Sequence, residues 1–307
     1  MNVLVTGATG FVGREVLHHL RAAGHASRIL ARNPGSPAVR EIAAQFSAEV
    51  RPGNVLAPES LADVAAGCDA VIHLVGIISE LGEQTFENVH LRATQHVLAA
   101  AQAGAARRFL HMSALGTRPN ARARYHQTKW AAEVAVRASG LAWTIFRPAL
   151  IFGAQDHFVN RFARMSRVAP ALPVLGDGRR LQQPVAVADV AACFVRALVE
   201  PDAVGQTYEV CGPDRLTLPE ILHAILAAMG RRRLLVHLPM PLARLQAALL
   251  EKIFPVLLRQ ASPLNRDQLL MLEEDNVGDA TAAFRLFGIK PTPFSAGIRE
   301  YLGPPQG

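Results

Sequence analysis

The first half of the chain alternates between short segments that are apolar throughout and longer segments with one apolar face. We predict strands over 2–6, 27–31, 48–51, 70–75, 108–112 and 142–147, and helices over 11–23, 37–46, 59–66, 85–104 and 126–139. Strands covered on both faces stay apolar, whereas a sheet with one wet face shows alternation. The pattern therefore predicts an α/β fold, a Rossmann-type doubly wound parallel sheet between two helical layers.

The second half is less regular, because prolines and glycines interrupt it. Asp189 is expected to cap a helix over 190–198. Further expected elements are a short strand over 183–187 and helices over 218–229, 242–259 with a break at Pro255, and 265–274 entered from Asn265. We therefore expect a main domain over residues 1–200, to which the chain partly returns later, and a small, mainly helical C-terminal lobe over 201–307.

A glycine-rich loop joins the first predicted strand to the first predicted helix. In such loops the first glycine permits a tight turn, the second lets the backbone approach a pyrophosphate, and the third allows close packing of helix on strand. The helix N-terminus offers unpaired N–H groups to the anion. Dinucleotide contacts are therefore predicted for Gly7, Thr9, Gly10, Phe11, Val12 and Gly13.

The end of the second strand indicates which dinucleotide binds. NAD sites place an acidic residue there for the ribose hydroxyls. Here Arg32 follows the strand instead, and a guanidinium suits a 2′-phosphate, so we predict NADP(H) rather than NAD(H). A solvated arginine is the alternative. By their positions after the third and fourth strands, further cofactor contacts are expected from Asn54, Val55, Leu74, Val75 and Gly76.

A second motif pairs Tyr125 with Lys129 on one face of a helix. The chain holds only three tyrosines and three lysines. A pair at this spacing is expected by chance ~0.03 times. A nearby ammonium favours the phenolate, so Lys129 is expected to lower the pKa of Tyr125. Ser113, after the preceding strand, would hold a carbonyl. Asn88 would anchor a water near Lys129 in a proton relay or, alternatively, cap its helix.

Composition excludes several classes of protein. The net charge is +7, but the arginines are dispersed, so no nucleic-acid partner is predicted. Three isolated cysteines fit neither a disulfide framework nor a zinc ribbon, and the histidines lack HExxH spacing, so no metal is predicted. No basic and apolar leader opens the sequence and no run of about 20 apolar residues occurs, so a cytoplasmic location is expected.

These motifs resemble the short-chain dehydrogenase/reductase superfamily in its extended and atypical branches. A narrower resemblance is to the NAD(P)H-binding accessory subunit of respiratory complex I and its bacterial relatives. It rests on HLVG at 73–76, MSALG at 112–116, RPALIFG at 147–153, QPVAVADVA at 183–191, PLNRDQLLMLEEDNV at 263–277 and GIKPT at 288–292. The RPALIFG match adds Pro148 to the expected cofactor contacts.

The resemblance implies an NADP(H)-binding Rossmann domain and a C-terminal lobe for substrate or partner. Three functions stay open. The first is hydride transfer to a carbonyl or quinone-like apolar substrate, with Ser113, Tyr125 and Lys129 as the reacting set. The second is a non-catalytic accessory or assembly factor for a quinone-linked respiratory complex or for quinone biosynthesis. The third is a nucleotide-sugar epimerase or dehydratase. No oligomeric state is predicted.

The C-terminal lobe contains a leucine-rich segment beside basic residues. Its apolar residues are Leu242, Leu245, Leu249, Leu250, Ile253, Leu257 and Leu258, and the neighbouring basic residues are Arg244, Lys252 and Arg259. The favoured interpretation is a helix pair that covers the core and closes the substrate cleft. The other is an amphipathic surface that docks on acidic lipid or on a membrane or respiratory-complex partner, which would place the protein at the inner face of the membrane.

Overall fold

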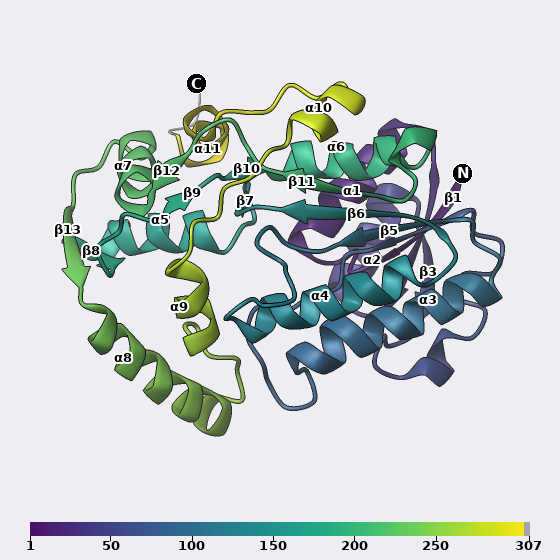
Figure 1. The fold of residues 1–307 in the computed structure, drawn as a ribbon, viewed down its shortest axis with the longest axis horizontal. Coiled ribbons are helices and arrows are strands. Elements are labelled where there is room, and N and C mark those ends of the chain that lie inside the picture. Colours follow the sequence, from purple (N-terminus) through teal and green to yellow (C-terminus); the bar gives the residue numbers. More distant parts are fainter. Residues whose placement is uncertain (304–307) are drawn as a thin grey trace.

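A seven-stranded parallel sheet forms the centre of the protein. The computed structural model describes residues 1–303 (Figure 1). The strand order is β11-β6-β5-β4-β1-β2-β3, and every neighbouring pair is parallel. The strands are β1 (Asn2–Thr6), β2 (Ala26–Ala31), β3 (Glu49–Pro52), β4 (Ala70–His73), β5 (Arg108–Met112), β6 (Ala142–Pro148) and β11 (Gln206–Val210). The predicted doubly wound fold is confirmed.

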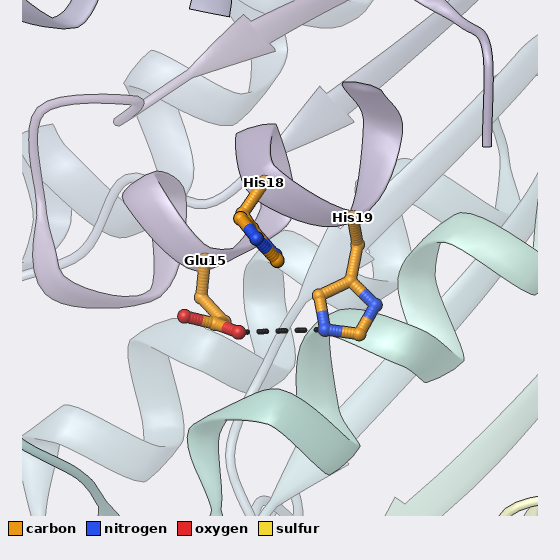
Figure 2. A group of neighbouring side chains, drawn as sticks. All are labelled: Glu15, His18 and His19. Atoms are coloured by element: carbon orange, nitrogen blue, oxygen red, sulfur yellow. Dashed lines mark ion pairs between the residues drawn. The ribbon is translucent and has the colours of Figure 1, made fainter. Parts of the chain in front are cut away.

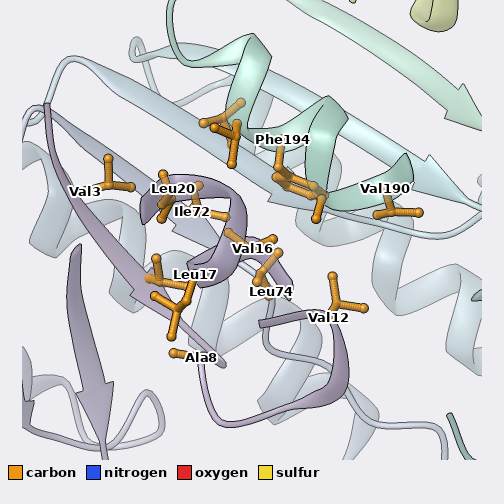
Figure 3. Close-up of a cluster of buried hydrophobic side chains, with 14 of the residues drawn as sticks. Val3, Ala8, Val12, Val16, Leu17, Leu20, Ile72, Leu74, Val190 and Phe194 are labelled. Carbon is orange, nitrogen blue, oxygen red and sulfur yellow. The ribbon is translucent and has the colours of Figure 1, made fainter. Parts of the chain in front are cut away.

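Helices cover both faces of the sheet, which explains why its strands are apolar throughout. One face packs against α1 (Phe11–Ala22), α2 (Pro37–Phe46) and α6 (Val187–Ala197). Figure 3 shows this layer, with Val16 and Leu20 of α1 and Phe194 of α6 above the strands. The other face packs against α3 (Ala93–Ala103) and α4 (Arg124–Arg137).

A second, smaller core lies beyond the carboxyl ends of the strands. Phe152, Leu222 and Phe294 are almost fully buried in it. Its elements are α5 (Phe158–Val168), β8 (Ala171–Leu175), α7 (Leu218–Ala228) and α11 (Phe294–Leu302), with β13 (Leu234–Leu238) paired to β8. Short connections β7 (Ile151–Phe152), β9 (Leu181–Gln182), β10 (Val185–Ala186) and β12 (Leu216–Thr217) link the two cores. This lobe therefore draws on residues from both sides of position 200.

A helical hairpin projects from this lobe. It consists of α8 (Met240–Ile253), the π-turn η4 (Phe254–Leu258) that contains Pro255, and α9 (Arg266–Leu272). Asn265 caps α9 in a capping box with Gln268, as expected from its position. Figure 1 shows the hairpin extending away from the sheet. The last long segment contributes α10 (Thr281–Leu286), which packs beside β11.

Several predicted elements differ in the structure. The segment predicted as a helix over 59–66 forms only the short 3-10 turn η1 (Pro58–Leu61), because Asp63 and Gly67 adopt positive φ. Asp189 lies inside the first turn of α6, where its carboxylate accepts a hydrogen bond from the Thr292 N–H at 2.8 Å, so it is not the cap. The edge strand β11 has no counterpart in the predicted pattern, and no helix in residues 1–303 is long and apolar enough to cross a membrane.

The contact of α1 with the loop before it makes a stability prediction. A Cβ at Gly13 would lie 2.2 Å from the Gly7 carbonyl oxygen, which the backbone cannot relieve without moving the helix. We expect Gly13→Ala to lower the free energy of unfolding by about 1–3 kcal/mol in urea titrations. Gly35→Ala is the control, because its only close neighbour is 3.8 Å away. Equal stability of the two variants would contradict the assigned packing.

Candidate functional site

The glycine-rich loop at the end of β1 has the geometry of an anion site. Gly7 has φ +80° and accepts the Gly10 N–H at 3.0 Å, which closes the turn. Gly10 is the N-cap of α1 and supplies no side chain, so the N–H groups of the first turn remain unpaired toward the loop. Val12 is buried in the core, so only its backbone faces the loop. Thr9 is exposed beside it.

The other predicted cofactor residues follow the carboxyl ends of neighbouring strands. Arg32 comes directly after β2, is exposed, and makes no hydrogen bond or ion pair within residues 1–303. Asn54 shapes its own turn, since its Oδ1 accepts the Leu56 N–H at 3.1 Å. Leu74 and Pro148 are buried, which leaves their backbone atoms for any contact, while Val55 and Val75 are partly exposed.

Lys129 of α4 lies at the carboxyl ends of β4 and β5. Its side chain is 2% exposed, and its Nζ donates to the Met112 carbonyl at the end of β5 at 2.9 Å. A Cβ at Gly76, after β4, would lie 3.1 Å from Nζ, so a larger residue there would push against the ammonium. The structure thus brings together Lys129, Gly76 and the end of β5, a neighbourhood that the separate motifs did not predict.

Burial controls the ionisation of both motif residues. It lowers the pKa of Lys129 to about 8, against the attraction of Glu133. Packing of the Tyr125 ring against Phe86, His90 and His126, with centroids 5.1–5.9 Å away, raises its pKa to about 12. The expectation that Lys129 lowers the pKa of Tyr125 is not met here, because burial dominates. Tyr125 is therefore a protonated donor near neutrality, and its hydroxyl forms no hydrogen bond within residues 1–303.

Ser113 is engaged in a buried ion cluster. Its hydroxyl is buried and donates to Glu133 at 2.5 Å. Glu133 is fully buried and also binds Arg147 and Arg137, with nearest distances of 2.6 Å. A buried carboxylate needs such partners. Glu133 follows Lys129 on α4 by one helical turn. The predicted role of Ser113 in holding a carbonyl has no support in this geometry, since its proton is directed to Glu133.

Asn88 lies in the π-helix η2 (Glu87–Arg92), which precedes α3. Its side chain donates to the Glu83 carbonyl at 2.8 Å, and its N–H donates to Thr85 Oγ1 at 3.1 Å. Within residues 1–303 no hydrogen bond joins it to Lys129. His90, two positions on, contacts the helix that carries Lys129. Its ring meets the Tyr125 ring edge to face, and its Nδ1 lies 2.9 Å from Thr128 Oγ1.

Two further histidines form a buried stack behind Lys129. His73 and His111 face each other across β4 and β5 with ring centroids 5.6 Å apart. Burial and the nearby Lys129 lower the pKa of His73 to about 3 and that of His111 well below its usual value, so both are neutral. Neither ring nitrogen of His111 has a partner within the described residues. The apolar pattern of β4 and β5 does not predict this buried pair of polar side chains.

The C-terminal lobe reaches the start of α4. The Asp267 carboxylate of α9 accepts the N–H groups of Arg124 and Tyr125 at 3.0 and 2.7 Å. Nearby, the Asn265 side chain donates to the Ile78 carbonyl at 2.9 Å. Asp267 thus supplies the cap that α4 lacks in its own sequence. Sequence spacing gave no signal of this, because the partners are more than 140 positions apart.

Three side chains on α1 come close enough to share a cation. Figure 2 shows Glu15, His18 and His19 on the surface of the helix, and their ligand atoms lie within 4.8 Å of one another. Helical spacing of three and four residues brings them together, with Glu15 and His19 3.4 Å apart. The histidine spacing alone predicts no metal site, because the third potential ligand is the Glu15 carboxylate. Glu15 and His19 are half-buried and His18 is exposed, and a surface group of this kind does not by itself make a site.

One cavity lies apart from the motifs. It has a volume of about 560 Å³ and is lined by Trp130, Arg137, Arg147, Thr207, Tyr208, Glu209, Asp279 and Ala282. Neither Tyr125 nor a loop glycine lines it. A smaller one of about 220 Å³ includes Phe11 of the glycine-rich loop. The site is therefore assigned from the loop and from Tyr125 and Lys129 rather than from cavity size.

A family model described as NAD(P)H-binding matches residues 7–201. The chain belongs to this NAD(P)H-binding family. A relative from Arabidopsis thaliana, the mitochondrial NADH dehydrogenase [ubiquinone] 1 alpha subcomplex subunit 9, is 31% identical, with 97% of this chain and 76% of the relative covered. The predicted resemblance to this group is confirmed. A nicotinamide cofactor is thus established for the family, and the uncapped glycine-rich loop fits its pyrophosphate.

Other relatives are reductases, and the similar solved structures include epimerases. Ceramide reductase from Caulobacter vibrioides is 31% identical over 78% of this chain and 74% of its own length. The structure of UDP-glucuronic acid 4-epimerase from Bacillus cereus superposes with a TM-score of 0.74 at 18% identity, covering 98% of this chain and 99% of the other. At that identity the likeness shows the shared fold alone.

The buried ammonium of Lys129 makes stability depend on pH. Burial lowers its pKa to about 8 from 10.5, so between these values the unfolded chain keeps a proton that the folded chain has released. The contribution of Lys129 to the free energy of unfolding should therefore rise with pH across this window, by up to about 3 kcal/mol. It is measured as the wild type minus Lys129→Met difference, because burial raises the pKa of the three cysteine thiols and they act in the opposite direction above about pH 9. Urea titrations from pH 7.5 to 10.5 measure it. Exposed Lys252→Met is the control and should keep the wild-type slope. A wild-type slope in Lys129→Met would show that Lys129 is not the group responsible.

Proposed function

We propose that the protein is an NADPH-dependent reductase of an apolar carbonyl or quinone-like compound. The observation that carries the proposal is the Tyr125 and Lys129 pair on α4, with the Lys129 ammonium held at the strand ends and the Tyr125 hydroxyl free of protein partners. The bound nicotinamide supplies a hydride. The main domain, mostly within residues 1–200 with β11 returning to its sheet, would hold the nucleotide. Residues 201–307, together with α5 and β8, would shape the substrate or partner side, in a cytoplasmic protein.

In this proposal each residue has a separate task. Gly7, Gly10 and Gly13 let the backbone and the start of α1 bind the pyrophosphate. Tyr125, protonated near neutrality, donates its proton to the substrate oxygen, and Lys129 stabilises the phenolate that remains. Ser113 holds Glu133, and through it the helix that carries both residues, so it is a positioning residue. Asn88, in η2, is also a positioning residue, because its side chain donates to the Glu83 carbonyl of the preceding loop.

Arg32 supports NADPH over NADH, because its guanidinium is exposed at the end of β2 and has no protein partner within residues 1–303. We expect Arg32→Gln to weaken NADPH binding by about 10- to 100-fold and to leave NADH binding almost unchanged, since only NADPH carries the 2′-phosphate. Isothermal titration with both nucleotides measures this. Arg40→Gln, an exposed arginine on α2, is the matched charge control. An equal loss for both nucleotides would remove the preference.

The proposed proton donor is tested by removing one oxygen. We expect Tyr125→Phe to lower the single-turnover rate of NADPH oxidation by about 10²- to 10⁴-fold while nucleotide affinity stays unchanged. Candidate acceptors are long-chain ketones and quinones, and stopped-flow absorbance follows the bound nucleotide. Tyr208→Phe, which loses only a weak hydrogen bond of 3.4 Å to the Asp202 carbonyl, is the control. A wild-type rate in Tyr125→Phe would contradict the role.

A second function is favoured by two observations. The Ser113 proton is directed to Glu133 instead of the site, and burial raises the pKa of Tyr125. The relative from Arabidopsis, matched over 97% of this chain, is named as a subunit of NADH dehydrogenase [ubiquinone]. NADPH would then be a structural ligand in an accessory or assembly factor of a respiratory complex. In that case wild-type protein holds NADPH without oxidising it for any acceptor, whereas Lys129→Met weakens nucleotide retention.

A further inference from the structure

The helix α8 has its large and small side chains on unexpected sides. Ala243 and Ala247 are fully buried and pack against Leu269 of α9. Leu242, Leu245 and Leu249, spaced three and four residues apart, are each more than half exposed. A helix that covers a core buries its leucines and exposes its small or polar residues. α8 thus covers a small buried cluster through its alanines, and the expectation that its leucines face the core is wrong.

The exposed apolar side chains continue through η4. We call the leucine face the set Leu242, Leu245, Leu249, Ile253, Val256, Leu257 and Leu258, whose members are 44–76% exposed. Leu234 and Val236 of β13 lie just before it in the chain and are also exposed. Nine of the fifteen exposed large apolar residues in the described structure therefore fall within 25 positions. Scattered apolar residues need no explanation, but a concentration of this kind marks an interaction surface.

The charge of this segment indicates what covers it. Residues 231–266 contain seven arginines and lysines and one acidic residue, Glu251. Arg266 is paired with Glu251 and Arg244 with Glu273, which leaves five basic side chains without an ion pair within residues 1–303: Arg231, Arg232, Arg233, Lys252 and Arg259. Lys252 and Arg259 flank the leucine face, are exposed, and form no ion pair within residues 1–303. A second copy of the chain would place two such basic surfaces against each other, which costs energy. An anionic surface with an apolar interior satisfies both features.

We propose that the leucine face docks on a bilayer that contains anionic phospholipid. The leucines enter the boundary between headgroups and acyl chains, and Lys252, Arg259 and the run Arg231 to Arg233 stay among the headgroups. In Figure 1 the α8–α9 hairpin projects from the body of the protein, so the face has room to approach a plane. This contact is peripheral, as the helix is 14 residues long.

Docking would also bring the bilayer to the proposed site. α9 packs against α8, and its Asp267 caps the helix at Tyr125. The Ser79 hydroxyl donates to the Ser262 carbonyl at 3.1 Å, so the loop between β4 and η2 is tied to the same hairpin. An apolar substrate dissolved in the bilayer then enters beside α9. This step rests on the proposed reductase function, whereas the docking itself does not.

Vesicle flotation of the whole protein tests the docking. The probes are vesicles of phosphatidylcholine alone and of phosphatidylcholine with one-third phosphatidylglycerol. We expect the wild type to float with the anionic vesicles, and Leu245→Ser/Leu249→Ser/Ile253→Ser to bind about tenfold more weakly or not at all. Lys252→Gln/Arg259→Gln should lose the preference for anionic lipid but keep part of the binding. Circular dichroism verifies that each variant is folded.

The control removes exposed apolar groups elsewhere. Val199→Ser/Val204→Ser lies next to the short turn after α6, and both valines are exposed. It should float like the wild type. Wild type that does not float, or equal flotation of the leucine variant, overturns the proposal. A wild-type dimer that the leucine variant converts to monomer by light scattering, with no vesicle binding by either, assigns the face to a second copy instead. Neither result depends on NADPH oxidation.

Discussion

Burial of one ammonium group sets the requirements for the rest of the site. Lys129 can lie inside the protein because the Met112 carbonyl accepts a hydrogen bond from its ammonium and Gly76 leaves space beside it. Both positions depend on β4 and β5 ending side by side, which the parallel sheet provides. The surrounding His73, His90 and His111 are neutral, so they add polarity without repelling the charge. The parallel sheet thus provides the backbone positions that allow a lysine ammonium to be buried.

The sequence predicted this part of the molecule well because the relevant signals are local. Strand alternation, the loop from Gly7 to Gly13 and the four-residue spacing of Tyr125 and Lys129 each depend on nearby residues. The parallel topology then follows from the fold class, so the carboxyl ends of the strands had to meet. The same reasoning failed over 59–66, where positive φ at Asp63 ends the helix, a preference that composition does not reveal.

What the sequence could not supply are contacts between distant positions. Glu133 binds Ser113, Arg137 and Arg147 at once. The motif around Ser113 does not contain Glu133, so it does not reveal that the serine hydroxyl donates to this carboxylate. Asp267 caps the helix of Tyr125 from the other lobe. Likewise, the seventh strand β11 adds to the sheet although no regular alternation leads to it. Such long-range contacts determine which of the motif side chains are already bonded to other parts of the protein.

The leucine-rich segment illustrates a different limit. Spacing alone predicts an apolar helix face but cannot say whether that face points inward, because a buried and a membrane-facing stripe share one period. The structure decides through the neighbours: Ala243 and Ala247 already fill the contact with α9, so no room remains for the larger leucines on that side. With small residues inside and large ones outside, α8 presents an exposed apolar face, which is the surface proposed to dock on lipid. α4, which carries Tyr125, is therefore connected through α9 to α8, the helix that carries the largest group of exposed apolar side chains in the described structure.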